Sequence, residues 1–89
     1  MKLDAKFYGE IRKVKDDTVV PEDQYMVFLA KDNAFPATLD FYLKECMRLG
    51  ADIEHLGSVQ RTIERLVMWR SANKDKLKVP DAKDEKLAG

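Results

Sequence analysis

The sequence has little of what secreted, membrane-spanning or disulfide-bonded proteins usually contain. Only one of its 89 residues is cysteine, so no intramolecular disulfide can form. A single thiol, Cys46, is typical of a reducing compartment. No run approaches the roughly 18 apolar residues of a membrane span, and Met1–Lys6 contain no apolar signal core. We therefore expect a cytoplasmic protein, and the chain length predicts one domain.

Neither sign of charge is in excess, because 16 lysines and arginines balance 16 aspartates and glutamates. We therefore expect no membrane partner and no binding to long nucleic acids through surplus positive charge. Hydrophobic residues make up 45% of the chain, which is typical of a folded domain. Because a chain this short buries a limited core, self-association is a common way for it to gain stability.

Motifs of catalysis and metal binding are also missing. The sequence has no CxxC, HExxH or GxSxG motif and no glycine-rich phosphate loop. The one histidine, His55, could form a dyad with Cys46, but Cys46 falls on the predicted core face of a helix. A buried apolar thiol is a poor nucleophile. No set of carboxylates is spaced as metal ligands. We expect no catalytic residue, no metal and no cofactor.

The first thirty residues predict two strands. Residues 6–14 (KFYGEIRKV) alternate between two faces. Residues 24–30 (QYMVFLA) are aromatic or branched and apolar on both faces, which is typical of a strand covered on both sides. The charged residues 15–23, with Pro21, would connect the two strands. We expect an antiparallel β-hairpin.

Two helices are predicted after this hairpin. Asn33 is a favoured N-cap, which makes Pro36 the third residue of the first helix. Gly50 is a typical C′ stop. Asp52 would cap a second helix that ends near Asn73, and a later start at Ser58 is the alternative. The predicted apolar stripes are Phe35, Leu39, Tyr42, Leu43, Cys46 and Leu49 in the first helix, and Leu56, Val59, Ile63, Leu66 and Val67 in the second.

These elements together predict an α+β protein, in which an N-terminal antiparallel β-hairpin is followed by an antiparallel two-helix hairpin. Residues 1–73 would form this single domain. Residues 74–89 would form a polar tail, within which Leu77–Pro80 could dock.

The outward faces of both predicted helices combine aromatic and charged residues. Arg61, Arg65 and Trp69 recur every four residues and form one row beside Met68, and Phe41 lies among charges on the first helix. Three interpretations stay open. These residues cover their own chain, or they form a protein–protein interface, with self-association favoured. Alternatively, they line a pocket in which guanidinium groups pair with phosphates and aromatic rings stack a base.

Lys31, Asp32 and Asn33 stand at the mouth of the first helix. Free backbone N–H groups and the positive end of the helix dipole favour an anion there. A helix cap beside a solvated lysine explains the same residues without a ligand.

Residues 22–50 (EDQYMVFLAKDNAFPATLDFYLKECMRLG), together with WRSANKDKLKVPD at 69–81, resemble the phage anti-Thoeris proteins. These proteins act as sponges for cyclic ADP-ribose immune signals. The resemblance covers about residues 22–81 and implies a non-enzymatic protein in the cytoplasm of an infected bacterium, which binds the signal without cleaving it. It also implies a helical hairpin with a small sheet that forms homo-oligomers, hexamers in related sponges. Some related sponges hold cyclic oligonucleotides as well.

No ligand contact of that family carries over residue by residue, so the candidate site comes from the helix faces and the helix mouth. Arg61 and Arg65 would hold phosphates, an aromatic ring would stack on adenine, and the turn at 31–33 would contact ribose or phosphate. The alternative function is an interaction module that inhibits a host enzyme through Phe41, Met68 and Trp69. The candidate ligand-binding residues are Arg61, Arg65, Lys31, Asp32, Asn33, Phe35, Phe41 and Trp69.

Overall fold

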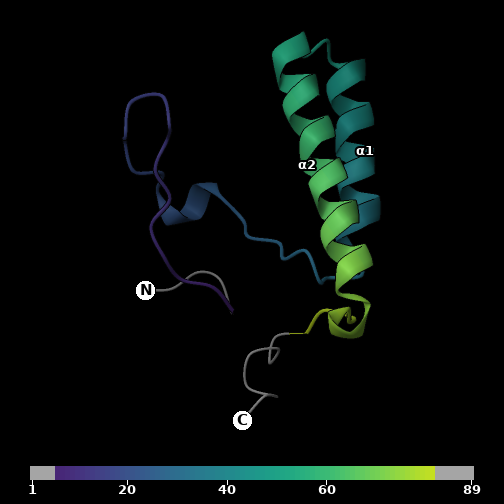
Figure 1. Cartoon of the computed structure of the whole chain (residues 1–89). Coiled ribbons are helices and arrows are strands. Elements are labelled where there is room, and N and C mark those ends of the chain that lie inside the picture. The colour runs from purple at the N-terminus through teal and green to yellow at the C-terminus, as the bar shows by residue number, and fades with distance from the viewer. Residues whose placement is uncertain (1–5, 82–89) are drawn as a thin grey trace. The chain divides into compact units, whose positions relative to one another are not determined.

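One antiparallel pair of helices dominates the structure, a computed structural model that describes residues 6–81. The elements, in chain order, are η1 (Glu22–Gln24), α1 (Phe35–Arg48), α2 (Ile53–Ala72) and η2 (Lys74–Lys76), where η denotes a short 3-10 helix. α1 and α2 lie side by side and run in opposite directions (Figure 1). The described residues divide into two compact units, one formed by residues 6–27 with Asp81 and the other by Phe28–Pro80. The predicted helical hairpin is therefore confirmed, and it lies in the second unit.

The predicted β-hairpin is wrong, because residues 6–81 contain no strand, and with it the α+β class is wrong. Backbone pairing in the first unit closes a local turn instead. Arg12 and Val19 form an isolated antiparallel bridge, and the Val20 N–H donates to the Ile11 carbonyl at 2.8 Å. Because this pairing lies within residues 11–20, it does not join the two segments that were predicted to pair.

Residues 24–30 show why the strand prediction failed. Their aromatic and branched side chains suggested a strand with both faces covered, but Met26 is 76% exposed and Phe28 is 47% exposed. β-propensity reflects packing against neighbours more than an intrinsic backbone preference. Without a partner ladder, this apolar run is irregular, and within the second unit its Phe28 ring stacks on Phe35 of α1.

The turn between α1 and α2 follows the prediction closely. Gly50 has φ +77°, and its N–H donates to the Met47 carbonyl at 3.2 Å. The Ala51 N–H donates to the Cys46 carbonyl at 2.9 Å, which completes a Schellman motif. Asp52 then caps α2, since its Oδ1 accepts the His55 N–H at 2.8 Å. The alternative start at Ser58 is therefore wrong.

The start of α1 differs from the prediction by one residue. Ala34 is the N-cap residue and makes no side-chain capping bond, so Pro36 is the second helical residue. Asp32 Oδ1 accepts the Ala34 N–H at 2.7 Å. The predicted cap, Asn33, instead uses its side-chain oxygen to accept a hydrogen bond from Arg70. The Asn33 side chain is therefore hydrogen-bonded to Arg70 of α2 and does not cap α1.

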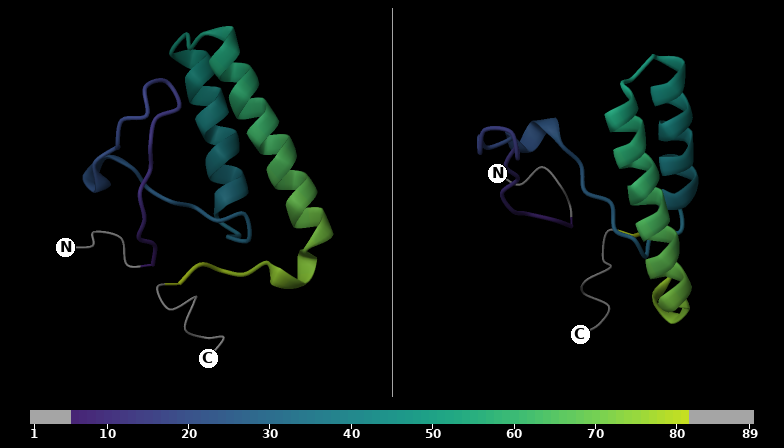
Figure 2. Two further views of the ribbon diagram at one scale, coloured as in Figure 1. Left: turned by 60° about the vertical axis from the view of Figure 1, so that its left-hand side comes forward. Right: turned by 45° about the horizontal axis from the view of Figure 1, so that its top comes forward.

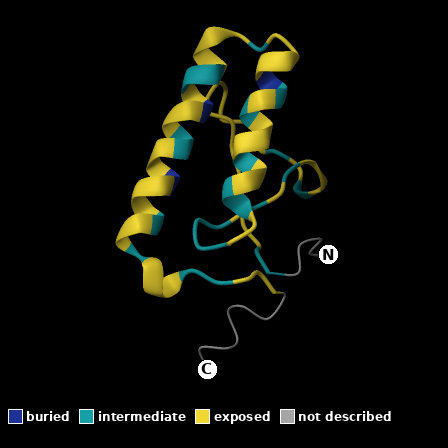
Figure 3. Ribbon diagram, turned by 90° about the vertical axis from the view of Figure 1, so that its right-hand side faces the viewer, coloured by how far each residue is buried: buried dark blue, intermediate teal, exposed yellow. Residues whose placement is uncertain are grey.

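The core between the helices is thin (Figure 3). Only Cys46, Val59 and Leu66 are buried among the apolar residues that the structure describes. The predicted stripes are right along the helix contact, where Leu43 and Ile63 are half-buried. They are wrong at their edges, and the exposed members are Tyr42 at 48%, Leu49 at 71% and Val67 at 60%. Across residues 6–81, no helix has both the length and the apolar character needed to cross a bilayer.

The chain after α2 turns back toward the start of α1 (Figure 2). Leu77 and Lys78 are half-buried, and Lys78 forms an isolated parallel bridge with Asp32. The predicted docking of this segment is therefore seen at Lys78. Residues 82–89 of the predicted tail lie outside the described part of the chain.

Candidate functional site

A pocket of about 270 Å³ opens in the second unit, where the C-terminal half of α2 passes the start of α1. The helix supplies one face, because residues 62, 65, 66 and 69 follow the i, i+3, i+4, i+7 spacing of a single helical surface. The opposite wall comes from the irregular segment before α1 and from its first residue. We call this the aromatic pocket, and it is lined by Phe28, Ala30, Phe35, Thr62, Arg65, Leu66 and Trp69.

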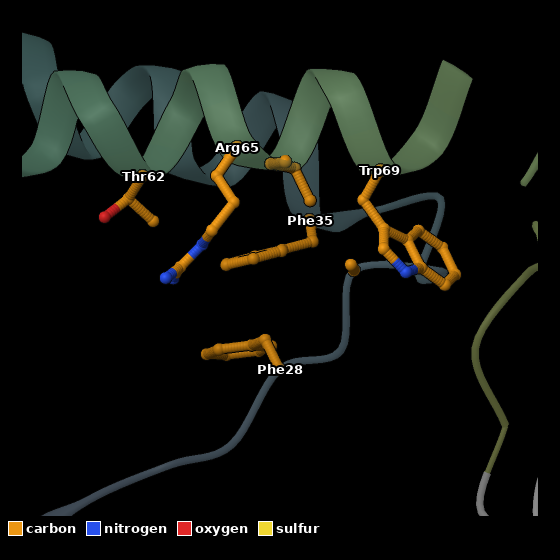
Figure 4. Close-up of a pocket in the computed structure, with 7 residues that line it drawn as sticks. Phe28, Phe35, Thr62, Arg65 and Trp69 are labelled. Carbon is orange, nitrogen blue, oxygen red and sulfur yellow. The ribbon is translucent and has the colours of Figure 1, made fainter. Parts of the chain in front are cut away.

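Two phenylalanine rings form the centre of the aromatic pocket. Phe28 and Phe35 stack with ring centroids 5.4 Å apart and an angle of 12° between their planes. Figure 4 shows Arg65 and Trp69 on opposite sides of this ring pair, both projecting from α2. Trp69 is 37% exposed and Phe28 is 47% exposed, so the aromatic surface is open to a ligand. The site therefore places flat apolar surfaces next to a single guanidinium group.

The aromatic pocket brings together three of the predicted residues: Phe35, Arg65 and Trp69. Arg65 and Trp69 belong to the predicted row on α2. A guanidinium group pairs well with phosphate or carboxylate oxygens, and aromatic faces accept a planar ring. The combination is chemically suited to an aromatic anion.

Two other predicted residues do not line this pocket. The Arg61 guanidinium lies along α2, since its Nη1 is 3.3 Å from the position that a Cβ on Gly57 would occupy. Phe41 lies on α1 and is 63% exposed. Both stay candidate residues, but they stand apart from the three that the pocket unites.

The predicted anion site at residues 31–33 is engaged in the fold. The N–H groups of Ala34 and Phe35 donate to the side chain and the carbonyl of Asp32. The Asn33 N–H donates to the Lys78 carbonyl at 2.9 Å, so it too has a protein partner. Lys31, Asp32 and Asn33 remain candidate residues, although the N–H groups on which the anion argument relied are already used.

Sequence reasoning missed Phe28 and Thr62 as pocket residues and Arg70 as the residue that holds the adjoining turn. Thr62 could have been found, because it lies on the same helical face as Arg65 and Trp69. Phe28 was assigned to a covered strand, and no local pattern indicates that its ring stacks on Phe35. Arg70 falls outside the predicted row, and its contacts join residues nearly forty positions apart.

Two titratable groups with shifted pKa values lie outside the aromatic pocket. A hydrogen bond between the Tyr42 phenol and the Cys46 side chain raises the pKa of that phenol, and the charge of Cys46 and partial burial act in the same direction. The Tyr42 hydroxyl also lies 3.1 Å from His55 Nε2. In the first unit, the hydroxyl and backbone N–H of Thr18 donate to Asp16 and lower its pKa. These interactions explain local structure and add no chemistry to the pocket.

Among the described side chains, no three metal-ligating groups gather at one place. A scan against protein-family models, a search of curated proteins and a search of solved structures each found no match for the chain.

Proposed function

We propose that this protein is a non-enzymatic phage sponge, which binds a cyclic ADP-ribose-type signal in the aromatic pocket and sequesters it in the cytoplasm of an infected bacterium. The observation that carries the proposal is the placement of Arg65 beside the stacked Phe28 and Phe35 rings, with Trp69 on the other side. A nucleotide offers the matching pair of features, a flat base and an anionic phosphate. The resemblance to anti-Thoeris proteins supplies the class of signal.

The roles of the pocket residues follow from their chemistry. Trp69 and the phenylalanine pair offer π-faces, and stacking of a base on an aromatic residue contributes about 1–3 kcal/mol. Arg65 would donate charge-assisted hydrogen bonds to a phosphate at the rim. At about 270 Å³, the pocket is slightly smaller than the roughly 300–1,000 Å³ of typical ligand sites. It therefore suits the base with its sugar, while the phosphates project past Arg65.

Sequestration without cleavage is tested by recovery of the ligand. The full-length protein is mixed with a cyclic ADP-ribose isomer, separated from free ligand, and heated, and the released small molecule is identified by mass spectrometry. Intact ligand that appears only after denaturation supports the sponge. A hydrolysed product would identify an enzyme, and failure of a panel of cyclic nucleotides to raise the melting temperature would refute nucleotide binding.

The Arg65→Gln substitution tests the site itself. We expect roughly 10- to 100-fold weaker binding by calorimetry, because a hydrogen bond to a charged group contributes about 1.5–3 kcal/mol and 1.4 kcal/mol corresponds to tenfold. Arg48→Gln is the matched control, since Arg48 pairs with Glu45 on α1 and does not line the pocket. Equal affinities of the two variants would place the ligand elsewhere.

A second candidate function is supported by exposed apolar side chains outside the pocket. Phe41 is 63% exposed and Met68 is 72% exposed, and neither lines the pocket. Such residues are enriched at protein interfaces, so this surface fits either self-association or inhibition of a host enzyme by direct binding. Two results together would favour this alternative. The wild type would bind a protein partner but no nucleotide, and Phe41→Ser and Met68→Ser would lose the partner.

A further inference from the structure

The turn at residues 30–33 is held from the side of α2 by one arginine. Arg70 Nη1 donates to the Ala30 carbonyl at 2.9 Å and to the Asp32 carbonyl at 3.1 Å. Arg70 Nη2 donates to Asn33 Oδ1 at 2.9 Å. Three acceptors on one short turn thus share a single guanidinium group. The planar fork of arginine is suited to such multiple recognition, whereas a lysine ammonium group is not.

The same turn is held from its other side by the chain after α2. The Asn33 N–H donates to the Lys78 carbonyl at 2.9 Å, and the Lys78 N–H donates to the Lys31 carbonyl at 3.1 Å. This pairing is the parallel bridge between Asp32 and Lys78. We call Arg70 and the backbone of Lys78, together with the turn that they hold, the clasp.

The clasp is continuous with the wall of the aromatic pocket. Ala30 both accepts a hydrogen bond from Arg70 and lines the pocket. Phe28 lies two residues before Ala30, and Phe35 lies two residues after Asn33. Both stacked rings are therefore attached to the ends of the turn that the clasp fixes. Arg70 itself is not among the lining residues, so it acts on the pocket only through this turn.

We propose that Arg70 is a positioning residue for the aromatic pocket, which fixes the Phe28–Phe35 stack by holding the 30–33 turn. Removal of the fork leaves the turn held by the Lys78 backbone alone, so the turn loosens at Ala30 and the Phe28 wall moves away from α2. The effect on the ring stack does not depend on the proposed function. The effect on ligand affinity rests on the proposed function.

The ring stack is tested in the ligand-free, full-length protein. In Arg70→Gln, we expect the ring-proton chemical shifts of Phe28 and Phe35 to move toward those of unstacked rings. The only tryptophan of the chain is in the pocket, so acrylamide should quench its fluorescence more strongly. We expect the ratio of closed to open turn to fall roughly tenfold or more, because charge-assisted hydrogen bonds are lost.

Two comparisons show that the effect is local. Arg48→Gln also removes an arginine from a helix, and it should leave both the ring shifts and the quenching unchanged. In Arg70→Gln, the His55 amide, which donates to the Asp52 cap at the far end of the hairpin, should keep its hydrogen-exchange protection. A loss of stability throughout the unit would lower that protection as well.

Substitutions of the acceptor give a second test, which remains decisive if Arg70→Gln fails to fold. Asn33→Ala removes the acceptor of Arg70 Nη2 and should loosen the ring stack. Asn33→Asp adds a negative charge opposite the guanidinium group and should tighten it. Opposite shifts of the Phe28 ring signals in this matched pair support the proposal.

Addition of a cyclic ADP-ribose isomer distinguishes a failure of the proposed function from a failure of the positioning role of Arg70. If the wild type binds it, Arg70→Gln should bind it roughly tenfold more weakly although Arg65 is intact. If the wild type does not bind it, the proposed function fails, while the ring signals still decide the role of Arg70. The proposal is overturned if the Phe28–Phe35 stack is unchanged in folded Arg70→Gln, or unchanged in both Asn33 variants.

Discussion

At the scale of single residues, Gly50 is a position where the backbone conformation restricts which side chain is tolerated. Its φ of +77° is a left-handed conformation, and no atom lies within 4 Å of a Cβ placed there, so the backbone alone opposes substitution. We expect Gly50→Ala to lower the free energy of unfolding by about 1–2 kcal/mol. Urea unfolding followed by circular dichroism measures this loss.

The matched control is a second Gly→Ala change in the same hairpin. Gly57 lies inside α2, where alanine is favoured over glycine by about 0.8–1.0 kcal/mol. Its new Cβ would meet only Arg61 Nη1, at 3.3 Å, and this end of a flexible side chain can move. Gly57→Ala should therefore stabilise the protein. The prediction is contradicted if Gly50→Ala and Gly57→Ala change the free energy of unfolding in the same direction.

Single residues also show where prediction from the sequence succeeds. Asp52 and Gly50 were predicted correctly, because each acts on backbone groups within a few residues of itself. The same reasoning predicted that Asn33 caps α1, and this prediction was wrong. Its side chain is bonded to Arg70, which lies 37 residues away in the sequence, and no local pattern reports a partner at that distance.

At the scale of elements, the helices were predictable and the strands were not. A helix satisfies its backbone hydrogen bonds within itself, so its apolar period and its caps identify α1 and α2. A strand depends on a partner, and alternation in residues 6–14 does not say where that partner is. The actual pairing, Arg12 with Val19, closes a short turn, and residues 24–30 form no β-bridge.

In the aromatic pocket, too, the residues on the helical wall were predictable and those on the irregular wall were harder to predict. Arg65 and Trp69 come from a regular helical face and were predicted as one row. Phe28 comes from an irregular segment, and its position depends on the turn that Arg70 holds. The sequence therefore identified the charged and indole groups of the pocket, but could not place half of its aromatic stack.

At the scale of the whole molecule, the thin core favours assembly. Cys46, Val59 and Leu66 are the buried apolar residues of the described chain, whereas Phe41 and Met68 are largely exposed. We expect the protein to form a homo-oligomer through these exposed side chains, because short chains commonly gain stability by association.

Light scattering at micromolar concentration measures this assembly. The double variant Phe41→Glu with Met68→Glu should fall to the mass of a single chain and lose thermal stability, since charges would be buried at the interface. Val14→Glu is the control, because Val14 is fully exposed at 104% and should tolerate the same change. A wild type that remains a single chain would contradict the expectation.

The bridge between Asp32 and Lys78 also predicts the order in which the helical hairpin and the pocket fold. These residues are 46 positions apart (78 − 32), whereas the turn between α1 and α2 joins neighbours in sequence. Contacts between distant residues require the entropy of a long loop to be lost first, so they form late. The helical hairpin should form before the pocket. In stopped-flow refolding, the Trp69 signal should therefore lag behind the far-ultraviolet signal of the helices, and simultaneous signals would show that the pocket forms together with the hairpin. A chain that ends after Ala72 but before Lys78 can then build both helices and still have an unfinished binding site.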